Sequence, residues 1–284
     1  MKKSFLFILA LFVFLPQVIP AKGHLLIIGG GDRPDYLAEK IYELAGGGNA
    51  RIVIIPNASE DKIDAATYTL EGLKKAGFKN YDYIMFDRNT ADADSNLAKL
   101  DNTTAVYFTG GDQIRITRDL LGTKMLEKIR KIYADGGVIS GTSAGAAIMS
   151  KIMLTGNELI NKDTTSSYFT IQKGNIETVE GLGFVTKAII DQHFITRKRL
   201  NRLISVVLEH PDKIGIGIDE STSIIVNPDD TFDVLGESLV MVFDATNAKN
   251  ISTNKKDYLS ASGIKLSILK SGDKYSMTKR TVIK

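Results

Sequence analysis

A serine flanked by glycines is the clearest sign of chemistry in this sequence. The segment Gly141-Thr142-Ser143-Ala144-Gly145 has the G-x-S-x-G spacing of a nucleophile elbow, which is a sharp turn between a strand and a helix. Glycines two residues to either side of the serine let the neighbouring chain pass without a clash with a Cβ atom. The pattern predicts that Ser143 is a nucleophile. The alternative interpretation is a turn of small residues that packs a helix closely on a strand.

A serine nucleophile needs a general base, and the chain offers three histidines. His24 begins a predicted strand near the N-terminus, and His210 ends a predicted helix directly before Pro211. His193 closes an apolar segment within Asp191-Gln192-His193-Phe194, where a side chain emerges at the rim of a sheet. We therefore predict that His193 is the base, and the alternative is a histidine with a purely structural role.

The composition is that of an ordinary globular protein, with 43% hydrophobic and 24% charged residues among 284. The absence of cysteine excludes disulfides, a thiol nucleophile and thiolate metal sites. A formal net charge of +3 gives no electrostatic support for nucleic-acid binding. The three histidines also lack the spacing of a zinc-binding pair. We expect no nucleic-acid partner, no metal and no organic cofactor.

The first 21 residues are typical of a secretory signal peptide. Lys2 and Lys3 precede an apolar run over residues 5–15, which is short for a span of a bilayer. The alternative interpretation is an uncleaved membrane anchor. We expect a signal peptide at residues 1–21, a single domain at residues 22–284, and a secreted or periplasmic protein.

Apolar runs separated by helical patterns predict a parallel sheet that is covered on both faces. Because right-handed crossovers bring the carboxyl ends of such strands to one edge, polar motifs at these ends should share one site. From about residue 223 onward, short antiparallel strands are expected to extend the same domain. The predicted strands are 24–28, 51–56, 83–86, 105–108, 189–194 and 214–220, and the predicted helices are 34–44, 62–76, 114–121, 125–134 and 196–209.

A glycine loop, Gly29-Gly30-Gly31-Asp32, follows the first predicted strand. It lacks the G-x-G-x-x-G spacing of a dinucleotide-binding turn, and no acidic residue follows the second strand where a ribose would require one. We interpret the loop as a tight strand-to-helix turn beside the active site, with a nucleotide site as the alternative.

Four motifs together resemble the cyanophycinase branch of the S51 serine peptidases, a family that also includes aspartyl dipeptidases. The resemblance covers nearly all of the chain after the signal peptide. It implies an α/β fold, a flavodoxin-like three-layer sandwich similar to class I glutamine amidotransferases, with a mostly parallel sheet and an antiparallel C-terminal extension. The motifs are Phe108-Thr109-Gly110-Gly111-Asp112-Gln113, Gly141-Thr142-Ser143-Ala144-Gly145-Ala146-Ala147, Asp191-Gln192-His193-Phe194 with Arg197, Arg199 and Arg202, and Gly217-Ile218-Asp219-Glu220.

The resemblance also implies a catalytic apparatus. Ser143 would attack the scissile carbonyl, His193 would carry the proton, and the backbone N–H groups of Gly111 and Ala144 would hold the oxyanion. The family places an acid shortly after the elbow, which favours Glu158 as the residue that orients the histidine. Glu220 lies at another strand end and is the alternative.

The substrate implied by the resemblance is cyanophycin, a polyaspartate whose side-chain carboxyls carry arginine through isopeptide bonds. Its implied products are β-aspartyl-arginine dipeptides. The arginines of the third motif share one predicted helix, where they can meet substrate carboxylates, and the alternative is a solvated helix face. The residues predicted to bind substrate are Gln113, Asp191, Gln192, Arg197, Arg199 and Arg202.

Two other functions stay open at this level. One is a dipeptidase for α-aspartyl or isoaspartyl peptides, because the segment 151–187 differs in length from both branches of the family. The other is an inactive secreted binding protein for aspartate-rich peptides. The resemblance further implies a homodimer.

Overall fold

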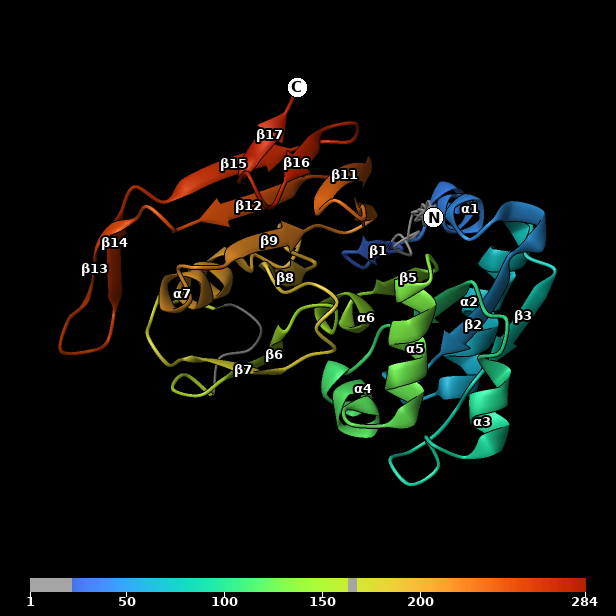
Figure 1. The fold of residues 1–284 in the computed structure, drawn as a ribbon. Helices are drawn as coiled ribbons and strands as arrows, with labels where there is room; N and C mark the ends of the chain where they lie inside the picture. Colours follow the sequence, from blue (N-terminus) through green and yellow to red (C-terminus); the bar gives the residue numbers. More distant parts are fainter. Residues whose placement is uncertain (1–21, 163–167) are drawn as a thin grey trace, which may run out of the picture.

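The computed structural model of the chain describes residues 22–162 and 168–284, so the predicted signal peptide lies outside the described residues. A nine-stranded sheet forms its centre (Figure 1). In order across the sheet, its strands are β17 (Thr281–Ile283), β16 (Lys274–Ser276), β11 (Thr231–Gly236), β10 (Thr222–Val226), β1 (His24–Ile28), β5 (Val138–Thr142), β4 (Ala105–Phe108), β2 (Arg51–Ile55) and β3 (Asn80–Tyr83). The five strands from β1 to β3 in this order are parallel to one another. The four strands from β17 to β10 extend the sheet beyond β1 through antiparallel pairs.

Helices cover both faces of the parallel strands. Successive side chains of β1 alternate between two apolar clusters, with Leu25 and Ile27 in one and Leu26 and Ile28 in the other. The first cluster includes residues of α4 (Gln113–Leu120), α5 (Lys124–Ala134) and α6 (Ala144–Ala147), and Leu97 of α3 (Asp94–Lys99) packs against it. The second includes residues of α1 (Asp35–Leu44) and α2 (Lys62–Lys75), and the short 3-10 helix η1 (Gly47–Asn49) follows α1. The predicted flavodoxin-like sandwich is thereby confirmed.

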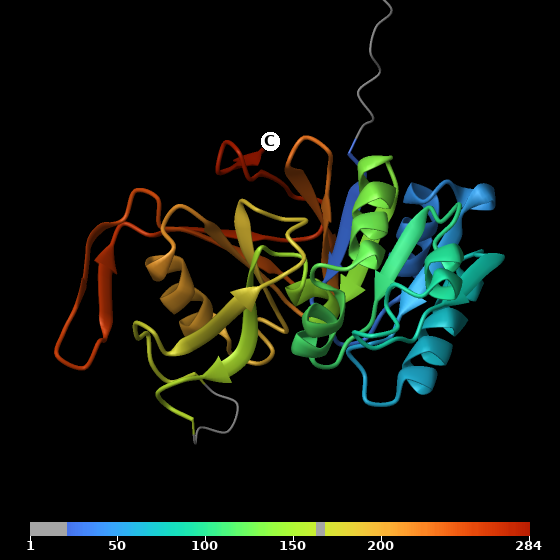
Figure 2. The same ribbon diagram turned by 60° about the horizontal axis from the view of Figure 1, so that its bottom comes forward.

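A second sheet of four strands takes two segments that the sequence had assigned to the first. Its order is β15 (Lys265–Leu269), β12 (Val240–Asp244), β9 (Ile214–Ile218) and β8 (Ala188–Gln192), and α7 (Leu200–Glu209) packs on it. The strands β8 and β9 are parallel, as predicted, but they pair with each other in the second sheet, and β10 occupies the edge of β1. In Figure 2 this sheet and α7, yellow to red, lie beside the blue and green parallel half.

Two hairpins complete the described structure. One pairs β6 (Ile152–Glu158) with β7 (Ile176–Glu180), and the other pairs β13 (Lys249–Thr253) with β14 (Leu259–Ser262). The second hairpin projects at the left of Figure 1. Over residues 22–162 and 168–284, no helix has the length and apolar character needed to cross a membrane.

Two elements differ from the prediction by three residues or more. The third strand is Asn80–Tyr83 rather than 83–86, because it lies at the edge of the sheet and no apolar run marks it. The buried Ile84 follows this strand. The helix predicted at 196–209 begins at Leu200, since the preceding turn has a left-handed residue, Lys198, with φ of 54°. Arg197 and Arg199 therefore precede the helix instead of sharing it with Arg202.

Candidate active site

Ser143 lies on a strained turn between β5 and α6. Its φ of 54° and ψ of −109° place a non-glycine residue in a sparsely populated conformation, as expected for a nucleophile elbow. The turn is also tightly packed. A Cβ atom on Gly145 would lie 2.3 Å from the carbonyl oxygen of Phe108, so no larger residue fits there. Close packing of a helix on a strand, the alternative considered for this motif, is thus part of the elbow itself.

A histidine and a carboxylate are aligned behind this serine. The Nε2 atom of His193 lies 2.9 Å from the Oγ atom of Ser143. The Nδ1 atom of the same ring lies 2.5 Å from the Oε1 atom of Glu220. His193 is 5% exposed, so its ring is held inside the protein with both nitrogens engaged. This order of hydroxyl, imidazole and carboxylate is that of a serine hydrolase triad.

The order of preference between the two acids is therefore reversed. Glu220 contacts the histidine, whereas Glu158 lies in the β6–β7 hairpin and accepts a hydrogen bond of 2.6 Å from Asn175. The cause is strand order, because β8 and β9 are neighbours with Gln192 opposite Ile218. The chain just beyond each of these strands, with His193 on one and Glu220 on the other, is thereby brought together.

The glycine loop after β1 lies against His193. A Cβ atom on Gly30 would lie 2.2 Å from the Cε1 atom of His193, and φ at this glycine is +108°, so a side chain here would displace the imidazole. The backbone of the loop holds the other sheet as well, since its Gly29 oxygen accepts the N–H of His193 at 2.7 Å. The loop is a turn between β1 and α1, as predicted, and it lies against His193.

The loop after β4 passes next to the nucleophile. A Cβ atom on Gly110 would lie 3.4 Å from the Cβ atom of Ser143. The adjacent Gly111 has φ of +136°, and a Cβ atom there would lie 2.1 Å from the carbonyl oxygen of Ala58. Ala144 follows the serine directly as the first residue of α6. Both residues predicted to form the oxyanion hole thus belong to segments that adjoin Ser143.

Two of the predicted substrate-binding residues neutralise each other inside the protein. Arg202 is 2% exposed, and its Nε atom donates to Asp191 at 2.8 Å while its Nη2 atom donates to the same carboxylate. Its Nη1 atom donates to the hydroxyl of Tyr168 at 2.7 Å. The pair joins α7 to the end of β8, so it fixes the chain next to His193 and does not face the cleft.

The amide side chains are also engaged internally. Gln113 donates to the carbonyl oxygens of Leu154 and Thr155 at 2.9 and 2.5 Å, which ties α4 to β6. Arg199 donates to the backbone and side-chain oxygens of Gln192. Burial and the charge of the nearby Arg202 lower the pKa of Arg199 to about 10.

Arg197 is the predicted substrate-binding residue that lines the cleft together with Ser143 and His193. Its side chain is half exposed, and its Nε atom lies 3.7 Å from Glu220. The same cleft is lined by residues that the sequence analysis missed, namely Arg33, Asp64 and Tyr68. Arg33 closely follows the glycine loop at the carboxyl end of β1, and its place at that edge was the signal that could have identified it.

The surroundings of His193 favour the neutral form of its imidazole. Burial lowers the pKa of His193, and the positive charges of Arg197 and Arg199 lower it further, against the opposing effect of Glu220. A neutral imidazole whose Nδ1 faces a carboxylate carries its proton there and can accept another at Nε2. The ring is thus prepared to act as a base toward Ser143.

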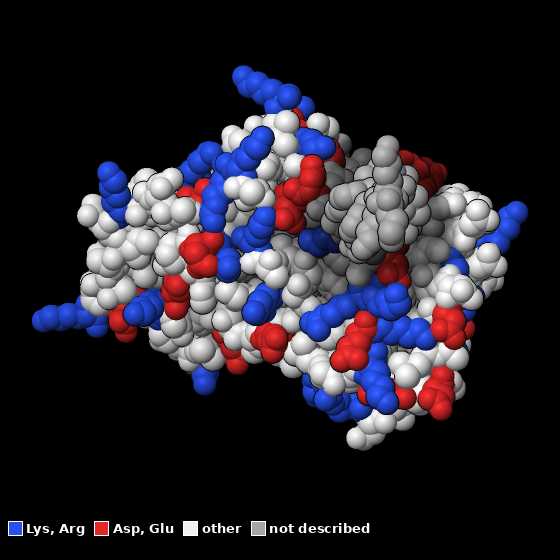
Figure 3. Space-filling model, in the orientation of Figure 1, with Lys and Arg blue, Asp and Glu red and all other residues white. Residues whose placement is uncertain are grey.

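Charge on the visible surface is mixed. In Figure 3, basic and acidic side chains alternate over the face seen in Figure 1, without a broad field of one sign. In the part of the chain that the structure describes, no cluster of three histidines or carboxylates is arranged to hold a metal ion. The positive charges of Arg33 and Arg197 at the cleft are therefore local and do not belong to a broad basic surface.

Several known peptidases are similar to this chain. Residues 25–234 match the model of peptidase family S51. The cyanophycinase of Trichormus variabilis is 32% identical over 272 residues, which cover 92% of this chain and 88% of that protein. The cyanophycinase of Geminocystis herdmanii is 31% identical over 263 residues, which cover 90% of this chain and 94% of that protein. A solved peptidase from an acI-B1 actinobacterium has the same fold, with a TM-score of 0.67 and 19% identity over 91% of this chain and 98% of that one.

Proposed function

The chain belongs to peptidase family S51 and is a serine-type peptidase, and from this premise we propose that it is an exported exopeptidase that degrades cyanophycin to β-aspartyl-arginine dipeptides. The observation that carries the mechanism is the contact of 2.9 Å between Ser143 and His193 on a strained elbow. The cyanophycinases that are about one third identical over nine tenths of the chain support the choice of substrate.

The proposed reaction proceeds through an acyl-enzyme. The Oγ atom of Ser143 attacks the scissile carbonyl while the Nε2 atom of His193 accepts its proton, and the resulting imidazolium protonates the leaving amine. Water then attacks the ester with the same ring as base. Glu220 holds the tautomer with the proton on Nδ1 and stabilises the imidazolium.

The negative oxygen of the tetrahedral intermediate is assigned to the backbone N–H groups of Gly111 and Ala144. Support comes from the left-handed φ of Gly111, which only glycine adopts readily, and from the place of Ala144 directly after the nucleophile. Each such donor contributes roughly 3 kcal/mol to transition-state binding in serine hydrolases.

Substitution of Arg197 tests the proposed role of His193 as a base. The charge of Arg197 disfavours the imidazolium, so Arg197→Gln is expected to raise the pKa of His193. Since only the neutral ring can act as a base, the acid limb of kcat/KM should move to higher pH. The pH profile of kcat/KM measures this shift. Arg115→Gln, which removes an arginine paired with Glu60 on the surface, should leave the limb in place. A limb that moves to lower pH in Arg197→Gln would contradict the assignment.

Incubation with insoluble cyanophycin, followed by mass spectrometry of the soluble products, tests the proposed substrate. We expect β-aspartyl-arginine to accumulate. Parallel incubations with α-aspartyl and β-aspartyl dipeptides address the related activity, since cleavage of the dipeptides alone would identify a dipeptidase. If neither polymer nor dipeptide is cleaved and Ser143 resists a fluorophosphonate probe, the protein is a binding protein and the proposal fails.

Export is proposed from the charged and apolar pattern of residues 1–21. Intact-mass measurement of the protein recovered from outside the cytoplasm is expected to show a chain that lacks this segment. Recovery of the full-length chain from the cytoplasm would contradict export without affecting the proposed reaction.

A further inference from the structure

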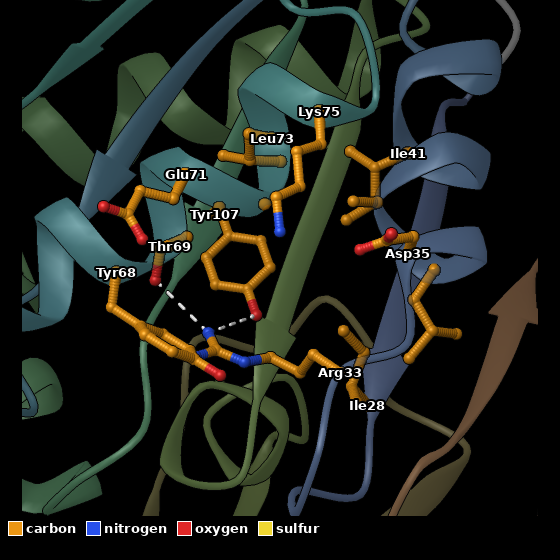
Figure 4. Close-up of a pocket in the computed structure, with 13 residues that line it drawn as sticks. Ile28, Arg33, Asp35, Ile41, Tyr68, Thr69, Glu71, Leu73, Lys75 and Tyr107 are labelled. Carbon is orange, nitrogen blue, oxygen red and sulfur yellow. Dashed lines mark hydrogen bonds between the residues drawn. The ribbon is translucent and has the colours of Figure 1, made fainter.

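Arg33 stands at the boundary between two hollows. It lines the cleft that contains Ser143 and His193, and it also lines a pocket between α1 and α2. Tyr68 and Thr69 belong to both linings as well. Figure 4 shows the Arg33 side chain reaching from the loop after β1 toward these two residues of α2. A guanidinium group is therefore built into the wall of the active-site cleft.

Neutral groups hold this guanidinium in place. Its Nη1 atom donates to the Oγ1 atom of Thr69 at 3.2 Å and to the hydroxyl of Tyr107 at 3.4 Å. The ring of Tyr68 lies 4.4 Å from the guanidinium carbon, a cation–π distance. Burial disfavours the charged form, but Tyr107 and Tyr68 outweigh it, and the pKa of Arg33 is raised. These contacts orient the side chain, and none of them neutralises its positive charge.

No carboxylate in the described part of the chain forms an ion pair with Arg33. Asp35 and Glu71 line the pocket from α1 and α2 respectively, and neither is bonded to Arg33 (Figure 4). Arg202 and Arg197 differ in this respect, because Arg202 is paired with Asp191 and Arg197 lies 3.7 Å from Glu220. Arg33 is therefore a half-buried cation in the cleft whose charge the described residues do not neutralise.

We propose that Arg33 binds a carboxylate of the substrate beside Ser143 and is a specificity-determining residue for acidic peptides. A guanidinium presents five N–H groups in a planar fork, and the contacts of Arg33 with Thr69 and Tyr107 both use Nη1. The remaining edge of the guanidinium matches a carboxylate, which supplies the negative countercharge that this partly buried cation lacks. This assignment rests on the proposed hydrolase function, because it takes the cleft at Ser143 as the substrate site.

Kinetics on a matched pair of substrates test the role. One is a short β-aspartyl-arginine oligomer with free arginine carboxylates, and the other carries carboxamides in their place. Wild-type protein should prefer the acid. In Arg33→Gln, kcat/KM for the acid is expected to fall about 10- to 100-fold, mainly through KM, and the ratio of acid to amide should approach one. Arg33→Lys should retain part of the preference, because it keeps the charge but loses the fork. Arg115→Gln is the matched control, with an unchanged ratio.

Calorimetry separates this proposal from the proposed function. Ser143→Ala protein is titrated with β-aspartyl-arginine and with its carboxamide. The titrations are repeated with double variants that carry Arg33→Gln or Arg33→Lys in addition to Ser143→Ala. Weaker binding of the acid alone supports the role of Arg33 even if the wild type hydrolyses neither oligomer. An unchanged ratio of acid to amide, an equal loss for both ligands, or no binding of either ligand to Ser143→Ala would overturn it. Should Arg33→Gln fail to fold, the Arg33→Lys ratio decides in the same way.

Discussion

Replacement of Ser143 by alanine is expected to lower kcat by about a million-fold, the order of loss found when the nucleophile of a serine triad is removed. The reason is geometric: Ser143 is the residue whose hydroxyl meets the Nε2 atom of His193, at 2.9 Å. Activity should be measured by release of soluble dipeptide from polymer, and occupancy of the serine by a fluorophosphonate probe. Both signals should disappear together.

The control for this substitution is Ser271→Ala, which changes an exposed serine between β15 and β16. It should retain full activity and labelling. The backbone at residue 143 has φ of 54°, a strained conformation for alanine as much as for serine, so the stability of Ser143→Ala should stay close to that of the wild type. A folded Ser143→Ala protein that still releases dipeptide would remove this serine from the mechanism.

Replacement of Glu220 by glutamine is expected to reduce kcat by about 10⁴-fold, as when the acid of a serine triad becomes an amide. The Nδ1 atom of His193 lies 2.5 Å from the Glu220 carboxylate, which selects the tautomer that leaves Nε2 free to accept a proton. A neutral amide cannot stabilise the imidazolium in the same way. Steady-state kinetics on the soluble oligomer measure the loss.

Glu158→Gln is the matched variant for this comparison, because it makes the same chemical change in the acid that the sequence favoured. Its side chain accepts from Asn175 in the β6–β7 hairpin, so less than about a tenfold change in kcat is expected, in line with the loss of a peripheral hydrogen bond. The reverse result, with Glu158→Gln inactive and Glu220→Gln active, would restore the sequence-based choice.

Most of the parallel half was predictable from the sequence, since its strands are buried on both faces and read as continuous apolar runs. The strands β1, β2 and β4 lie within one residue of their predicted ends. The edge strand β3 was misplaced because its side chains face solvent and its sequence, Asn80–Tyr83, has no apolar pattern. The second sheet could not be foreseen, because apolar runs alone do not say which strand pairs with which.

The same limit explains what was missed at the site. The elbow is local, so Ser143 could be found from a five-residue motif, and His193 stood out because the chain has few histidines. The contact between His193 and Glu220 depends on the pairing of β8 with β9, which spacing along the chain does not encode. Likewise the arginines were expected to face solvent or substrate, whereas Arg202 turns inward to Asp191 from its place in α7.

The proposed triad is assembled across the seam between two sheets, and this has a consequence for the chain while it folds. Ser143 follows a strand of the nine-stranded sheet, and His193, 50 residues later, follows a strand of the other. During synthesis the serine therefore leaves the ribosome well before its base. Under the proposed mechanism, the hydroxyl has no proton acceptor until the second sheet docks on residues 29–31. The proposed reaction therefore needs the complete fold, and an opening of the seam is expected to stop it before the parallel half unfolds.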